Sequence, residues 1–202
     1  ATGPGLDIVA ARDDELRIYR REGAELVLRQ ALKNPTSTQG INSITPYIVS
    51  GVFERDGPLG LATIDGDGDL LLYRRGPEGD FSTQFSRPLG SGATGVLAAG
   101  DVDGDGVDEL AVVTTVGAFP SPSDGLRDGF FSLQVYRVTP GGLDIRAMLG
   151  ASGYFPGNPT SLSVQDMDGD GSPEIWWSAG GQLYRLVLEE GELRLQRSWP
   201  GV

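Results

Sequence analysis

Two acidic segments carry the side chains in this sequence that are best suited to chemistry. They read Asp101-Val-Asp-Gly-Asp-Gly-Val-Asp-Glu109 and Asp166-Met-Asp-Gly-Asp-Gly-Ser-Pro-Glu174. Each segment has carboxylates at positions 1, 3, 5 and 9 and glycines at positions 4 and 6. Calcium takes about six to eight oxygen ligands from carboxylates and carbonyls, and glycines let the backbone curve around such an ion. The spacing therefore predicts two calcium sites.

Two other interpretations of these segments compete with this one. An EF-hand loop needs a glutamate at position 12 and a helix on each side. Position 12 is Val112 in the first segment and Trp177 in the second, and both residues lie in runs that are typical of strands. The alternative to a metal site is an acidic surface turn that binds nothing. Because the same spacing occurs twice, we expect calcium loops between β-strands.

Composition excludes several classes of function. The chain has 202 residues, which suits one domain, and no apolar run is long enough to span a membrane. Its net charge of −12 argues against a nucleic-acid partner, because phosphate binding depends on lysine and arginine. Cysteine and histidine are both absent, and the remaining residues show no nucleophile with an adjacent base. We therefore expect a protein that is not an enzyme.

A second phrase, Leu-x-x-Tyr-Arg, recurs along the chain. It ends at Arg20, Arg74 and Arg137, and a shorter copy ends at Arg185. Runs typical of strands lie before and after each copy, which gives four short strands in about 50 residues, as in β-propeller blades. We therefore expect an all-β fold of about four four-stranded β-propeller blades in a single domain, 1–202, with repeats at approximately 1–46, 47–94, 95–159 and 160–202.

The first repeat begins in the middle of its loop, so the strand that would open it has no sequence. One expectation is that the chain is the C-terminal part of a larger propeller with about seven or eight blades. The other is a small ring or an open array whose edge a partner covers, because uncovered strand edges promote association.

The acidic loops and their flanking strands resemble FG-GAP/VCBS repeats, the calcium-loop blades of integrin α-subunit heads and of many secreted bacterial proteins. The resemblance implies one Ca²⁺ ion at Asp101, Asp103, Asp105 and Glu109 with the carbonyl of Val107, and a second ion at Asp166, Asp168, Asp170 and Glu174 with the carbonyl of Ser172. In the second repeat the corresponding positions 1 and 9 are Val52 and Gly60, so no ion is expected there. For Asp65-Gly-Asp-Gly-Asp69 we expect a charged hairpin turn, with metal binding as the alternative.

The resemblance also implies a function. It points to a non-catalytic calcium-binding scaffold that mediates protein–protein interaction, adhesion or assembly of an exported or cell-surface complex. The expected location is extracellular, on the cell surface or periplasmic, where calcium is abundant. The alternative is a fragment or accessory domain of a carbohydrate-active enzyme. The long connections 33–46, 119–131 and 150–159 are the candidate faces for a protein or carbohydrate partner, and one of the adjacent Trp176 and Trp177 should lie in the core.

Overall fold

The computed structural model describes residues 7–12, 15–34, 44–65, 68–89, 96–120, 127–150, 159–179 and 181–200, and these residues form strands and turns without a helix. The strands form four antiparallel sheets in which each strand pairs with the next one along the chain. The first sheet has β1 (Asp7–Arg12), β2 (Glu15–Glu22) and β3 (Glu25–Lys33). The second has β4 (Ile44–Gly51), β5 (Gly60–Asp65), β6 (Asp69–Arg75) and β7 (Phe81–Pro88). The third has β8 (Leu97–Gly100), β9 (Glu109–Pro120), β10 (Arg127–Thr139) and β11 (Gly142–Gly150). The fourth has β12 (Pro159–Gln165), β13 (Glu174–Ala179), β14 (Gln182–Glu189) and β15 (Glu192–Pro200).

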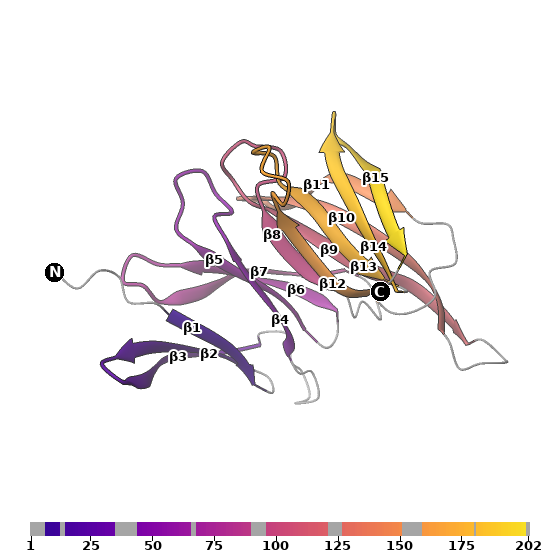
Figure 1. Ribbon diagram of the computed structural model, residues 1–202. Coiled ribbons are helices and arrows are strands. Elements are labelled where there is room, and N and C mark those ends of the chain that lie inside the picture. The colour runs from indigo at the N-terminus through magenta and orange to yellow at the C-terminus, as the bar shows by residue number, and fades with distance from the viewer. Residues whose placement is uncertain are drawn as a thin grey trace.

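The sheets follow one another in chain order across the molecule, each stacked on the next (Figure 1). Apolar side chains fill the spaces between consecutive sheets as three clusters. Strand β6 shows how the sequence produces this arrangement: Leu70 and Leu72 face the third sheet, while Leu71 and Tyr73 face the first. Because successive side chains in a strand point to opposite faces, a continuous apolar run buries both faces of a central sheet.

The first strand of each sheet contacts the first strand of the next, so β1, β4, β8 and β12 lie side by side. Strands β8 and β12 approach closely at Gly100. A side chain at Gly100 would place its Cβ 2.5 Å from Cγ1 of Val164, so only glycine fits here without displacement.

The two end sheets each have a face that no other described sheet covers. On the first sheet this face includes the exposed side chains of Ile8, Leu26 and Leu28. On the fourth sheet Trp176 stacks on Trp199, with 5.7 Å between the ring centroids. Arg185 also lies over Trp176, with 5.8 Å between its Cζ and the ring centroid.

Several expectations from the sequence can be compared with this architecture. The all-β class and the four-strand units are confirmed, and the structure describes three strands in the first sheet. Trp177 is buried in the core, at 2% exposure, and Trp176 lies on the opposite face. The connection expected at 119–131 is shorter than that range, because β9 extends to Pro120 and β10 begins at Arg127, so that Phe130 and Phe131 lie in a strand. The antiparallel pairing of β9 with β10 simply continues into this segment.

The middle parts of the other two candidate connections, 35–43 and 151–158, lie outside the described residues, as do 121–126. The repeat boundaries at 47 and 160 lie close to the starts of β4 and β12, Ile44 and Pro159. Among the described residues there is no helix with the length and hydrophobicity that a membrane crossing requires.

Candidate metal centres

The two acidic loops occupy equivalent places in neighbouring sheets. Residues 101–108 connect β8 to β9, and residues 166–173 connect β12 to β13, on the same edge of the stack (Figure 1). Each loop is closed by its own first aspartate. The carboxylate of Asp101 accepts hydrogen bonds from the backbone N–H groups of Asp105 (3.0 Å) and Gly106 (2.8 Å). The carboxylate of Asp166 accepts them from Gly169 (2.7 Å) and Gly171 (2.9 Å).

The glycines at positions 4 and 6 have the backbone conformation that this curvature needs. Gly104, Gly106, Gly169 and Gly171 all have φ between +76° and +91°. Residues with a Cβ rarely adopt that region. The glycines and the first aspartate therefore both favour this loop shape.

The carboxylates of each loop converge. In the fourth sheet, oxygens of Asp166, Asp168, Asp170 and Glu174 all lie within 4.8 Å of one another. In the third sheet, Asp101, Asp103 and Glu109 meet the same condition. Asp105 is outside this group. Both sets consist of hard oxygen donors of the kind that calcium prefers, so the residues present fit such an ion.

Each cluster is built on a buried glutamate. Glu109 is 0% and Glu174 1% exposed, and each begins the second strand of its sheet. Glu109 accepts a hydrogen bond from the N–H of Val102 (3.1 Å), and Glu174 accepts one from Met167 (3.4 Å). Burial raises the pKa of Glu109 above its usual value, and the hydrogen bond from Arg137 opposes that shift. A buried carboxylate needs a compensating positive charge.

Arginines supply positive charge to both clusters in this structure. Arg137, on β10, contacts Glu109 and Asp105. Arg185, on β14, contacts Glu174 and lies 2.5 Å from Asp168. These arginines hold the pKa of Asp105 and that of Asp168 below their usual values. Sequence reasoning recognised both arginines as part of the recurring Leu-x-x-Tyr-Arg phrase but missed that they reach the acidic loops.

The two residues expected to supply carbonyl ligands differ in their surroundings. Val107 is buried, and its carbonyl accepts a hydrogen bond from Nη1 of Arg137 (3.3 Å). Ser172 is exposed, and its N–H donates to Asp170 (2.8 Å). Of these two carbonyls, that of Val107 accepts a hydrogen bond from Arg137, the arginine that also contacts the acidic loop of the third sheet.

The loop of the second sheet, 52–59, contacts the acidic loop beside it. The N–H of Val52 donates to the carboxylate of Asp108 (2.6 Å), and the N–H of Asp108 donates to the carbonyl of Val52 (2.8 Å). Glu54, also in this loop, pairs with Arg74 at 3.0 Å. These contacts attach the third-sheet loop to its neighbour.

Asp65 is buried at the end of β5. Its carboxylate accepts hydrogen bonds from the side chain of Asn34 (2.9 Å) and from the N–H of Asp69 (2.9 Å). The bond to Asp69 closes a hairpin turn, and the bond to Asn34 connects that turn to the end of the first sheet. Asp67 of the same turn lies outside the described residues.

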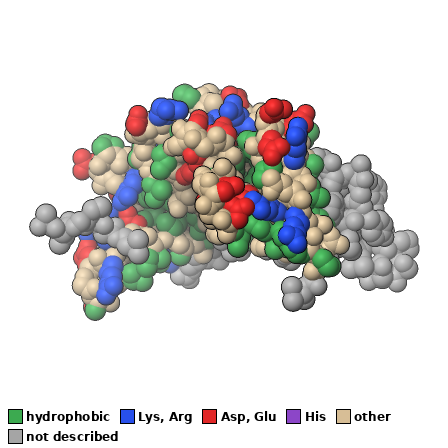
Figure 2. Space-filling view, turned by 45° about the horizontal axis from the view of Figure 1, so that its top comes forward, with side chains coloured by type: hydrophobic (Ala, Val, Ile, Leu, Met, Phe, Trp, Pro, Cys, Tyr) green, Lys and Arg blue, Asp and Glu red, His purple; other side chains and the backbone are tan. Residues whose placement is uncertain are grey.

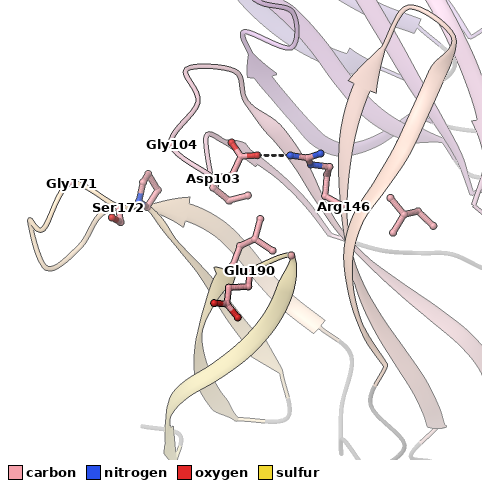
Figure 3. A pocket seen from close by; sticks show the side chains of 11 residues that line it. Asp103, Gly104, Arg146, Gly171, Ser172 and Glu190 are labelled. Atoms are coloured by element: carbon pink, nitrogen blue, oxygen red, sulfur yellow. Dashed lines mark hydrogen bonds and ion pairs between the residues drawn. The ribbon is translucent and has the colours of Figure 1, made fainter.

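A groove of about 520 Å³ separates the two acidic loops (Figure 3). Asp103 and Gly104 line one side and Gly171 and Ser172 the other, with β11 and the turn around Glu190 completing it. Asp103 pairs with Arg146 across one wall at 3.0 Å. The other lining residues are Val102, Ile145, Pro173, Leu188 and Gly191, so both polar and apolar residues line the groove. On the face of the molecule that Figure 2 shows, acidic and basic side chains lie intermixed.

No family model and no curated protein matches this chain. Solved structures resemble it in fold. A protein from Lactobacillus plantarum is 14% identical with a TM-score of 0.57, over 100% of this chain and 54% of that one. A rhamnogalacturonan lyase from Bacillus licheniformis is 15% identical with a TM-score of 0.55, over 92% of this chain and 42% of that one. A luciferin-regenerating enzyme is 16% identical with a TM-score of 0.52, over 100% of this chain and 60% of that one. The chain thus spans about half the length of the structures that it resembles.

Proposed function

We propose that this chain is a non-catalytic, calcium-binding scaffold made of β-propeller blades of the FG-GAP/VCBS type. Its role is to bind a protein partner, in adhesion or in the assembly of an exported or cell-surface complex. The observation that carries the proposal is the pair of convergent carboxylate clusters, each formed around a buried glutamate at one edge of the stack. Two such clusters in equivalent places fit one ion each. The proposed location is outside the cell or in the periplasm, where about millimolar calcium fills even weak sites.

The proposed role of the metal is structural. Several carboxylates held within 4.8 Å repel one another, and a bound divalent ion offsets that repulsion. An ion that binds only the folded chain stabilises it by mass action, by about 2.7 kcal/mol at a hundredfold excess over its dissociation constant. Each loop would hold one ion, and a partner bound in the groove between the loops would contact both of them.

The alternative, a fragment or accessory domain of a carbohydrate-active enzyme, predicts different surface residues. It would need an acid pair outside the loops that faces an aromatic-lined groove. None of the described residues that line the groove between the acidic loops is aromatic, and the likeness to a rhamnogalacturonan lyase is one of fold. The scaffold therefore remains our proposal.

A thermal melt tests the metal. The chain is melted in EDTA and in about 2 mM calcium, a concentration in the range that fills extracellular modules, alongside Asp103→Ala, Asp168→Ala and the control Asp144→Ala. Asp144 is exposed on β11 and lies outside both clusters. We expect calcium to raise the melting temperature of the wild type and of the control, and to raise it less in each loop variant. Identical melts in EDTA and calcium would refute the metal role.

A further inference from the structure

The arginine of the recurring Leu-x-x-Tyr-Arg phrase pairs with a carboxylate at the loop edge of every sheet. In the first sheet Asp7 begins β1, as Glu109 begins β9 and Glu174 begins β13, and so corresponds to position 9. Arg20 lies directly opposite Asp7, with 3.0 Å between Nε and Oδ1. In the third sheet Tyr136 lies opposite Leu110, which brings the following Arg137 to Glu109. In the fourth sheet Arg185 lies opposite Trp176 and reaches Glu174 diagonally. In these three sheets, the arginine of the phrase therefore contacts the carboxylate at position 9, although the strand register differs among them.

The second sheet shows what happens when position 9 has no carboxylate. Gly60 lies opposite Arg74, so this arginine pairs with Glu54 instead and its side chain is 53% exposed. Arg137 and Arg185, whose sheets do have the buried glutamate, are only 18% and 21% exposed. Position 9 thus determines whether the arginine is drawn into the loop.

The same carboxylate groups contact the arginines and would bind an ion. Arg137 contacts Glu109 and Asp105, and Asp105 is the predicted ligand that does not join the convergent group. Arg185 contacts Glu174 and Asp168, which both belong to their group. Two cations beside one set of carboxylates repel each other and compete for it.

We propose that Arg137 and Arg185 are internal counter-cations that hold the acidic loops together without calcium and are displaced when the ion binds. The inference rests on the proposed calcium function, which it deepens by assigning a residue that sets the affinity of each site. Without an ion, each arginine neutralises a buried glutamate whose isolated charge would destabilise the fold. With an ion present, the same charge lowers the affinity for calcium.

The two loops differ in how many arginines contact them. The third-sheet loop contacts Arg137, Arg146 at 3.0 Å from Asp103, and Arg55 at 3.8 Å from Asp105. Among the described residues, the fourth-sheet cluster contacts Arg185 alone. The fourth-sheet cluster also brings four carboxylates together, where the third-sheet cluster brings three. The arginines and the carboxylates therefore both favour tighter calcium binding by the loop at 166–174 than by the loop at 101–109.

Calorimetric titration with calcium tests the inference on the wild type, Arg137→Met, Arg185→Met and the control Arg74→Met. Methionine keeps the apolar stem and removes the charge. We expect each loop variant to bind calcium about tenfold more tightly at its own site, because one positive charge next to the ion is lost. We also expect each to melt at a lower temperature in EDTA. The control should bind calcium as the wild type does.

The outcomes separate this inference from the calcium function itself. If the wild type binds calcium and neither loop variant binds it more tightly, the arginines are merely structural and the inference is overturned. If no protein in the set binds calcium, the inference and the calcium function both fail. If the variants bind and the wild type does not, the inference is supported. Arg185, on an end sheet, gives a second test if Arg137→Met does not fold.

Discussion

The close approach of β8 and β12 makes Gly100→Ala a sharp test of how the sheets stack. The added Cβ would lie 2.5 Å from Cγ1 and 2.8 Å from Cβ of Val164, where ordinary contacts are 3.4–4 Å. Overpacking of this kind typically costs about 1–3 kcal/mol. Gly100 has no positive φ, so the backbone itself accepts alanine. We expect a loss of about 2 kcal/mol, or roughly 4–8 °C in melting temperature for a chain of this size.

The assay is urea unfolding of four proteins: the wild type, Gly100→Ala, Val164→Ala and the double variant. Val164→Ala removes the nearest atom but leaves Cβ at 2.8 Å, so the relief should be partial. The double variant should be about 0.5–1 kcal/mol more stable than the sum of the single changes predicts. Gly141→Ala is the control, because a Cβ there meets nothing within 4 Å. A Gly100→Ala protein as stable as the wild type, or strictly additive changes, would refute the contact between β8 and β12.

Two further predictions concern the cores. Trp177→Ala should lower the free energy of unfolding by about 3–5 kcal/mol, because the side chain is 2% exposed. Trp176→Ala, on the opposite face, should lower it clearly less. Urea unfolding measures both, and equal losses would contradict the assignment of faces. Burial raises the pKa of Tyr73 to about 12, so the folded chain keeps a proton that the unfolded chain releases near pH 10. Stability should therefore fall as pH rises from about 10 towards 12, and Tyr73→Phe should fall less; urea unfolding at several pH values measures this, and equal slopes would contradict it.

The sequence predicted most of the strands because their signals are local. Runs such as Leu70–Tyr73 are apolar on both faces, and turn residues follow each run. The glycines and carboxylates of the acidic loops also act over a few residues, so their spacing alone was enough to indicate a convergent cluster. The cluster of Asp166, Asp168, Asp170 and Glu174 matches the predicted carboxylates of that loop.

What the sequence did not reveal depends on contacts between distant segments. Arg137 lies 28 residues from Glu109, and only the pairing of β9 with β10 brings them together. Asp105 contacts Arg137 and lies outside the convergent group, which the spacing alone could not indicate. The full extent of β9 and β10 within 119–131 was not predicted, because prolines, serines and glycines there resemble a loop. The repeated arginine was visible in the sequence, but the sequence did not indicate which carboxylate it contacts.

The order of the sheets has a consequence for how the chain opens. Each apolar cluster joins two consecutive sheets, so the described part of the fold resembles a linear array with nearest-neighbour coupling. The second and third sheets are held on both faces, whereas the first has three strands and is held on one. Local unfolding with amide exchange should therefore begin at β1–β3 and spread inward. Asp7 resists that opening, because its carboxylate lies 3.0 Å from Arg20 in its own sheet and 2.5 Å from Arg75 in the next.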